Sequence, residues 1–302
     1  MEKTVAIHRV RKRFGPVEAV RDISFVVHPG EIFGLLGPNG AGKTTTIRML
    51  LDILRPDAGE IAVFGGALTQ AGKDRIGYLP EERGLYAQLK LLDVIVYLGS
   101  LKGLRRREAR ARAEPLLQRL GLWEQRKKKL SELSRGMHQK AQFIVTILHD
   151  PDLIIVDEPF AGLDPVNTQL IQEMIGELRT DGKSIIMSTH QLHQVEALCE
   201  RLVLIHQGVV RLSGSVRAVR EQFAGNEVLV EGAGPIDQAP GVVAARRHNG
   251  QWRLSLADDL DPASFLPQLV GVEGVRVTHY AAALPSLSEI FIRIVGNEGA
   301  DA

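Results

Sequence analysis

The sequence predicts an α/β domain built around a phosphate-binding loop, followed by a small α+β domain. One reason is the segment GPNGAGKTT at residues 37–45, which lies between the apolar runs 32–36 and 47–51. Another is the apolar run 153–156, which is followed by two carboxylates. Continuous apolar runs are typical of parallel strands covered on both faces, so they favour an α/β sheet. The α+β domain is expected because alternating, hairpin-like patterns begin after residue 224.

Length and composition are those of a two-domain globular protein. The chain has 302 residues, and a single core rarely grows past about 250 residues. A net charge of +1 gives no general attraction to nucleic acid, so no nucleic-acid partner is expected. Cys199 is the single cysteine, which favours a reducing compartment. The chain has no signal-peptide pattern and no apolar run near ~18 residues, so we do not expect it to cross a membrane by itself.

Residues 4–28 alternate between apolar and polar positions, as strands of a half-exposed sheet do. Phe14 lies between two such strands, just before the turn at Gly15. Its ring could simply fill the core. Since it precedes a phosphate loop, it could instead be the flat surface on which a purine base stacks.

Residues 37–45 have the G-x4-G-K-[ST] pattern of a phosphate-binding loop. The glycines let backbone N–H groups turn inward, where they and the following helix N-terminus favour negative charge. Lys43 would contact the β- and γ-phosphates, and the Thr44 hydroxyl would be a ligand of Mg²⁺. A triphosphate nucleotide is therefore expected in preference to an ordinary glycine-rich turn. The expected nucleotide-binding residues are Phe14, Gly37, Pro38, Asn39, Gly40, Ala41, Gly42, Lys43, Thr44 and Thr45.

A strand at 76–79 must end at Pro80, and Glu81 follows in a charged loop. Residues 91–148 then have a helical pattern without a strand-like run. Basic clusters at 105–112 and 126–129 favour a solvated helix face. The alternative is attraction to anionic lipid head groups, which salt-sensitive binding to liposomes would reveal.

Ser134, Arg135, Gly136 and Met137 interrupt this helical block. Ser134 can cap the helix that starts there, leaving free N–H groups at its N-terminus. Such an end binds anions but has no lysine of its own. This helix end would therefore be suited to contact a phosphate that is already bound by another part of the site.

The strand expected at 153–156 delivers Asp157 and Glu158 to its carboxyl end. Asp157 would lie beside the phosphate loop and hold Mg²⁺ directly or through water. Glu158 would point elsewhere and could take a proton from water. A buried strand that ends in a solvated acidic turn is the less favoured interpretation.

Two further residues lie at the ends of the next expected elements. Asp164 is placed to cap a helix that runs through residue 178. His190 leaves another buried strand at the carboxyl end, where ligands of open α/β sheets bind. A lone histidine is more often structural, but a neutral His190 could donate one N–H to a γ-phosphate and accept at its other nitrogen.

The tail after residue 225 predicts a small α+β unit. Strands at 242–247 and 251–256 flank an Asn-Gly pair, which is the strongest short hairpin signal. Helices are expected at 262–269 and 287–294. This unit shows no metal-binding spacing, so docking or dimerisation is its expected role.

The order of these motifs resembles that of the ATP-binding cassette (ABC) family over residues 1 to about 220. Phe14 matches the stacking aromatic, residues 37–45 the Walker A loop and residues 153–158 the Walker B strand. Leu133-Ser134-Arg135-Gly136-Met137 matches the signature motif LSGGQ. Asp164 lies in the matching D-loop, and His190 matches the switch histidine. The C-terminal extension is similar to that of ATPase subunits of bacterial drug, sodium or polysaccharide exporters.

The resemblance implies an ABC ATPase domain at 1–224, with a helical subdomain at about 91–148, and an accessory domain at 225–302. It implies a head-to-tail homodimer that holds two ATP molecules, each between Walker A of one copy and the signature of the other. It also implies a separately encoded membrane-spanning permease, with this chain peripheral to the cytoplasmic face of the membrane. Glu158, His190 and Lys43 would be catalytic, and Thr44, Asp157 and Glu81 would hold Mg²⁺.

This sequence departs from the family pattern at two places. Glu81 replaces a usual glutamine, and a carboxylate there could bind Mg²⁺ but would repel phosphate. Arg135 and Met137 replace a glycine and a glutamine of the signature. Hydrolysis is still expected. Two other functions are possible: a soluble ATPase switch that acts on ribosomes or DNA, and a regulatory or immunity ATPase without transport.

Overall fold

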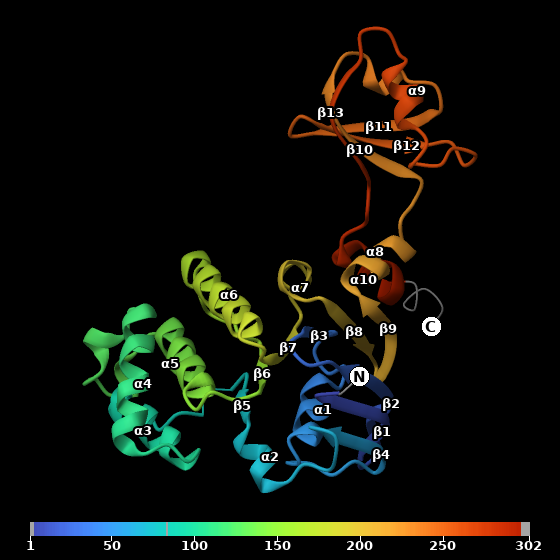
Figure 1. Cartoon of the computed structure of the whole chain (residues 1–302). Helices are drawn as coiled ribbons and strands as arrows, with labels where there is room; N and C mark the ends of the chain where they lie inside the picture. Colours follow the sequence, from blue (N-terminus) through green and yellow to red (C-terminus); the bar gives the residue numbers. More distant parts are fainter. Residues whose placement is uncertain (1–2, 83, 297–302) are drawn as a thin grey trace. The chain divides into compact units, whose positions relative to one another are not determined.

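A computed structural model describes residues 3–82 and 84–296, which form two compact units (Figure 1). The units are Met1–Val216 and Arg217–Ala302. The sequence places the boundary after residue 224 instead. Helix α8 (Val216–Gln222) groups with the second unit because Arg220 donates to the carbonyl oxygens of Leu284 and Pro285.

The first unit contains a mixed sheet with the strand order β4-β1-β2-β9-β8-β3-β7-β6-β5. Strand β3 pairs in parallel with β7 and β8, and β6 pairs in parallel with β5 and β7. Strand β1 is antiparallel to β2 and β4. The mixed α/β sheet expected from the sequence is therefore confirmed. Its strands are β1 Val5–Phe14, β2 Val17–Val27, β3 Ile32–Leu36, β4 Ala58–Val63, β5 Ile76–Leu79, β6 Leu153–Asp157, β7 Ser184–Thr189, β8 Arg201–His206 and β9 Val209–Ser215.

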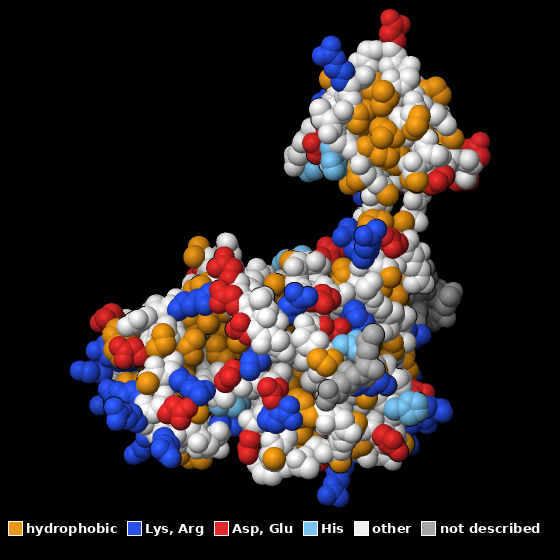
Figure 2. Space-filling view, viewed as in Figure 1, with side chains coloured by type: hydrophobic (Ala, Val, Ile, Leu, Met, Phe, Trp, Pro, Cys, Tyr) orange, Lys and Arg blue, Asp and Glu red, His pale blue; other side chains and the backbone are white. Residues whose placement is uncertain are grey.

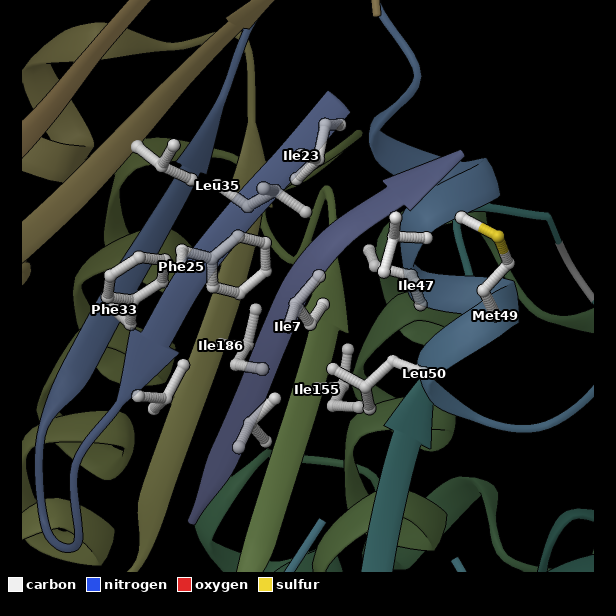
Figure 3. Close-up of a cluster of buried hydrophobic side chains, with 14 of the residues drawn as sticks. Ile7, Ile23, Phe25, Phe33, Leu35, Ile47, Met49, Leu50, Ile155 and Ile186 are labelled. Atoms are coloured by element: carbon white, nitrogen blue, oxygen red, sulfur yellow. The ribbon is translucent and has the colours of Figure 1, made fainter. Parts of the chain in front are cut away.

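The core of this unit fixes the position of helix α1, which follows the phosphate loop. Figure 3 shows side chains of α1, among them Ile47 and Leu50, packed with side chains from β1, β3, β6 and β7. Phe25 and Phe33 stack with their ring centroids 5.2 Å apart. Ile47 is 1% exposed and Leu50 is 2% exposed, so displacing α1 would open the core.

The block 91–148 is helical, as the sequence predicts, and no β-strand of the described chain falls within it. Figure 1 shows α3, α4 and α5 grouped beside the β5 and β6 edge of the sheet. Figure 2 shows Lys and Arg side chains gathered over α4, and Arg112 pairs with Glu108 at 2.7 Å. The first-unit helices are α1 Lys43–Leu50, α2 Gln70–Asp74, α3 Leu91–Leu101, α4 Arg106–Arg119, α5 Arg135–Ile147, α6 Pro165–Thr180 and α7 Leu192–Leu198, with 3-10 turns at Trp123–Gln125 and Leu130–Glu132.

The second unit is a four-stranded antiparallel sheet with helices. Its strand order is β11-β12-β10-β13, and the hairpin expected around Asn249-Gly250 joins β11 to β12. The expected helix at 262–269 is wrong in its start, because Asp261 forms a turn instead, accepting from the N–H of Ala263. The elements are β10 Glu227–Ala233, β11 Val242–His248, β12 Gln251–Leu256, β13 Arg276–Ala282, α9 Leu266–Val270, α10 Leu287–Gly296 and a 3-10 turn at Ile236–Gln238.

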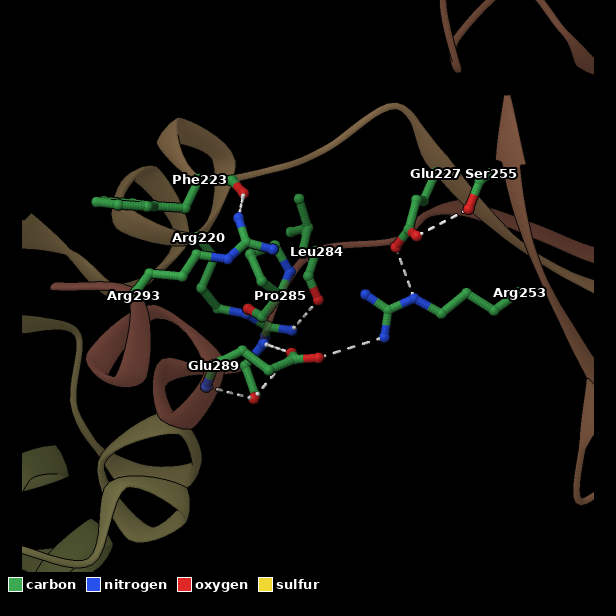
Figure 4. A network of polar contacts seen from close by, with 10 residues as sticks. Arg220, Phe223, Glu227, Arg253, Ser255, Leu284, Pro285, Glu289 and Arg293 are labelled. Carbon is green, nitrogen blue, oxygen red and sulfur yellow. Dashed lines mark hydrogen bonds and ion pairs between the residues drawn. The ribbon is translucent and has the colours of Figure 1, made fainter. Parts of the chain in front are cut away.

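An arginine network links the strands and helices within the second unit (Figure 4). The Arg253 guanidinium donates to Glu227 at 2.7 Å and reaches Glu289 of α10 at 3.5 Å. Arg293 donates to the carbonyl oxygen of Phe223 at 3.1 Å. In neither unit does a described helix have the length and apolar character needed to span a lipid bilayer.

Candidate functional site

The phosphate loop occupies residues 37–42, between β3 and α1. Gly37 and Gly42 have φ angles of 150° and 107°. A Cβ atom on Gly37 would lie 2.1 Å from the Ile205 carbonyl oxygen, and one on Gly42 would lie 2.6 Å from that of Ala19. Only glycine fits these two positions, because the neighbouring atoms belong to backbone of the sheet. The loop is therefore held rigidly against β2 and β8.

Lys43 begins helix α1 and turns its side chain back into the loop. Its ammonium group donates to the carbonyl oxygens of Gly37 at 2.7 Å and Pro38 at 3.1 Å. The residue is only 7% exposed. A buried ammonium whose partners are two neutral carbonyl oxygens is a strong site for a phosphate, because phosphate oxygens can replace these acceptors with charged ones.

Three carboxylates set the charge around Lys43. Burial lowers the pKa of the Lys43 ammonium, while Glu158, Asp157 and Glu81 oppose this shift. Burial raises the pKa of Asp157, and the negative charges of Glu81 and Glu158 raise it further. The site is therefore rich in negative charge, which a divalent cation would stabilise.

Thr44 and Asp157 provide the oxygen atoms that fit Mg²⁺. The Thr44 hydroxyl donates to Asp157 Oδ2 at 3.2 Å, and Asp157 is 1% exposed at the end of β6. No group of three or more His, Cys, Asp or Glu side chains that could hold a metal occurs in the described ranges. Magnesium does not require one, because it is usually bound through one or two carboxylates together with phosphate oxygens and water. The residues present therefore fit Mg²⁺ bound with a nucleotide.

Glu158 lines the same cavity as Asp157, although the sequence predicts that it points elsewhere. Side chains alternate along a strand, but β6 ends at Asp157 and Glu158 has a φ angle of 51°. This left-handed backbone turns the Glu158 side chain toward β7. There it accepts hydrogen bonds from the Thr189 hydroxyl at 3.1 Å and from the His190 backbone N–H at 2.9 Å.

His190 contacts the same carboxylate through its ring. Nδ1 lies 2.7 Å from Glu158 Oε1. An ionised carboxylate can only accept, so Nδ1 carries the proton in this contact. In a neutral ring Nε2 then has no proton to donate. Donation from His190 to a γ-phosphate therefore requires either a protonated ring or release of Glu158, which the sequence alone does not reveal.

Lys43, Thr44, Asp157 and Glu158 line one cavity of about 360 Å³, and His190 is not among its lining residues. Phe14 lies at its edge and is 46% exposed, as a surface for stacking a base would be. The lining residues are Phe14, Ala19, Asn39, Gly40, Ala41, Gly42, Lys43, Thr44, Thr45, Glu81, Asp157 and Glu158. None of the signature residues 134–137 is among them.

Ser134 caps α5 as the sequence predicts, because its hydroxyl accepts from the Met137 N–H at 3.3 Å. Ser134 and Arg135 are exposed. The Arg135 side chain covers Gly162 of the D-loop, where an added Cβ atom would lie 2.6 Å from Arg135 Nε. Asp164 caps α6 by accepting from the Asn167 N–H at 2.9 Å. The signature therefore presents an open helix end.

Sequence reasoning missed two residues at this site. Thr189 is 0% exposed and bonds the Glu158 carboxylate, and its place just before His190 was the available signal. Gln139 is 6% exposed and donates to the carbonyl oxygens of Glu158 and Pro159. A polar residue on the buried face of a helix was the signal there, since a buried amide must find partners.

We expect Glu81→Gln to change the metal dependence of nucleotide binding. The substitution removes a negative charge that acts on both Lys43 and Asp157. Without Mg²⁺, ATP affinity should rise by up to about fivefold, as expected for loss of repulsion between the phosphates and an exposed carboxylate. Titrations with and without Mg²⁺ measure this change. Weaker metal-free binding by the variant would show that Glu81 does not repel phosphate.

The fold and the site define a P-loop nucleotide-binding protein. Residues 20–161 match the family model for the ABC transporter, and residues 214–295 match that for the ATP-binding protein DrrA1-3-like, C-terminal domain. The chain belongs to the family of ABC transporter ATP-binding proteins. Proteins of this family bind ATP, generally with Mg²⁺, hydrolyse it and work with a separate membrane permease.

Three similar proteins illustrate this membership. The uncharacterised ABC transporter ATP-binding protein YhaQ of Bacillus subtilis is 37% identical over 97% of this chain and 98% of its own. The Nod factor export ATP-binding protein I of Burkholderia lata is 33% identical over 98% of both chains. A solved structure described as an ATP binding subunit of an ABC transporter is 32% identical, with a TM-score of 0.68, over 73% of this chain and 93% of that chain.

Proposed function

We propose that this chain is the ATP-hydrolysing subunit of an exporter and drives a separate permease from the cytoplasmic face of the membrane. The similarity to a Nod factor export ATP-binding protein over nearly the whole chain supports export. The two alternatives, a soluble switch and a regulatory ATPase, are not favoured, because the relatives are transporter subunits.

The observation that carries this proposal is the division of the site. Within one chain, a single cavity is lined by Lys43, Thr44, Asp157 and Glu158. Ser134 lies outside that cavity, at the exposed N-terminus of α5. A second copy placed head to tail would add its Ser134 end to the γ-phosphate of the first. Each ATP would then be held by Walker A of one copy and the signature of the other.

In this proposal each residue has one task. Lys43 neutralises charge on the phosphates, and the Phe14 ring stacks on the base. Thr44 and Asp157 would hold Mg²⁺, with Glu81 beside them, and bound Mg²⁺ would supply positive charge against the phosphate oxygens. Glu158 accepts a proton from the attacking water, a contribution that is typically worth about 10²- to 10⁴-fold in rate. His190 orients Glu158 and contacts the γ-phosphate.

An exposed apolar surface on the helical block is a suitable place for the permease. Tyr86 and Tyr97 are 52% and 41% exposed, and their rings meet edge to face at 5.9 Å. Leu101, one helical turn after Tyr97, is 61% exposed. A cytoplasmic helix of the permease with an apolar face would cover these side chains. Tyr86 also follows Glu81 closely in sequence, so a permease helix bound to this surface would affect the nucleotide site.

Copurification tests this assignment. The Leu101→Asp protein should no longer copurify from detergent extracts with a permease encoded beside it. The substitution would bury a charge in the contact. The ATPase activity of the free subunit should be unchanged. Ile53→Asp is the matched control, since Ile53 is also 61% exposed but lies outside this surface. Equal recovery of both variants with the permease would contradict the docking surface.

A further inference from the structure

Helix α5 connects the signature to the catalytic carboxylate of the same chain through one side chain. Gln139 lies two residues after Met137, the last residue of the signature, and is 6% exposed. Its amide nitrogen donates to the carbonyl oxygen of Glu158 at 3.2 Å and to that of Pro159 at 3.0 Å. Both N–H protons of one buried amide are thus used on the backbone of the candidate base and the next residue.

The backbone at Glu158 is the part of the site that needs such support. Its φ angle of 51° is uncommon for a residue with a side chain, and it persists only when the surroundings hold it. Thr189 at the end of β7 and His190, the next residue, hold the carboxylate, whereas Gln139 of α5 holds the backbone. Moving α5 would therefore move the backbone that aims Glu158.

Two other side chains of α5 reach the remaining loops of the site. Lys140 Nζ donates to Asn167 at 3.0 Å, next to the D-loop. Gln142 donates to the carbonyl oxygen of Glu82 at 3.1 Å, beside Glu81. These contacts make α5 a rigid connection between the signature and the loops that surround Glu158.

We propose that Gln139 is a positioning residue that couples the signature to the catalytic carboxylate of its own chain. When Ser134 binds the nucleotide held by a second copy, α5 would transmit this engagement through Gln139 to the backbone of Glu158. ATP bound at one site of the dimer would thereby position Glu158 at the other site. The inference depends on the proposed function, because it needs two copies that share two nucleotides.

The test uses the full-length protein and compares Gln139→Glu with Gln139→Leu. The glutamate variant has the same shape but directs a carboxylate oxygen at two carbonyl oxygens, and the leucine variant removes the polar group. For both variants kcat should fall about 10- to 100-fold, while the Kd for ATP stays within about twofold, because misplacing a catalytic group lowers turnover and not ground-state binding. Gln118→Glu is the control, since Gln118 is exposed on α4 and should leave kcat unchanged.

The pH dependence distinguishes positioning from packing. Burial should raise the pKa of the new carboxyl group, and its protonated form can again donate to a backbone carbonyl. Relative to the original protein, kcat of Gln139→Glu should therefore recover as the pH falls from about 8 to 6, whereas that of Gln139→Leu should not. Identical pH profiles of the two variants would overturn the proposal.

A double-mutant cycle with Ser134→Ala tests the coupling itself. If Gln139 transmits engagement of the signature, the cost of Ser134→Ala in kcat should shrink at least about threefold in the Gln139→Leu background. Independent, multiplicative losses would overturn the coupling. Absence of ATP hydrolysis by the original protein would instead contradict the proposed function, so the two failures are distinguishable.

Discussion

Replacing Glu158 with glutamine is expected to abolish ATP turnover and to leave ATP binding intact. The amide retains the size of the carboxylate, and its oxygen can still accept from the His190 backbone N–H. It cannot accept a proton from water, so kcat should fall by about 10²- to 10⁴-fold. The phosphate loop and Lys43 are unchanged, and the Kd for ATP should stay within about threefold, less than 1 kcal/mol.

Steady-state hydrolysis and equilibrium binding measure these two quantities. Glu114→Gln is the control, because it makes the same chemical change at an exposed position of α4. Turnover of Glu158→Gln close to that of the control would show that another group acts on the water.

Lys43→Met should have the opposite effect and strongly weaken ATP binding. Lys43 is 7% exposed and is the one cationic residue in the described cavity lining. Hydrogen bonds to charged groups are worth about 1.5–3 kcal/mol, so the Kd for ATP should rise at least about 10- to 100-fold. Methionine keeps most of the length of the side chain, and the fold should persist.

Calorimetric titration with ATP checks this prediction, and the melting temperature with and without ATP gives a second readout. Lys127→Met is the control, since Lys127 is exposed in the basic cluster at 126–129. Undiminished ATP affinity of Lys43→Met would contradict the assignment of the phosphate loop.

The sequence predicts the parts of this site whose signals are local. Gly37, Gly42, Lys43 and Thr44 form a contiguous pattern, and the structure places them between a buried strand and a helix as expected. The Ser134 and Asp164 caps also depend on neighbouring residues, and both are present. Such features follow from short-range backbone geometry, so they can be inferred without a fold.

The remaining features depend on contacts between distant residues. The Glu158 side chain turns toward β7 because the strand ends and the backbone becomes left-handed, which overrides the alternation rule. Thr189 meets Glu158 because β7 pairs with β6, and Gln139 meets it because α5 reaches the backbone that follows β6. In the second unit, the turn at Asp261 replaces the start of an expected helix, since its carboxylate competes for backbone N–H groups.

The arrangement of His190 gives the mechanism a physical constraint. The Nδ1 atom lies 2.7 Å from Glu158 Oε1, so a movement of the ring would also move or release the carboxylate that would activate water. Contact with a γ-phosphate through Nε2 would need a second proton on the ring or a new position of Glu158. The histidine can therefore link the presence of the γ-phosphate to the orientation of the base.

The most direct test of the account is the mass in solution of the Glu158→Gln protein with Mg-ATP. Sedimentation should show a dimer that retains one nucleotide per chain, and adding Ser134→Ala should return it to the monomer, because the open end of α5 would no longer grip the phosphate of its mate. A Glu158→Gln protein that binds ATP but sediments as a monomer at every concentration would contradict the shared-nucleotide site.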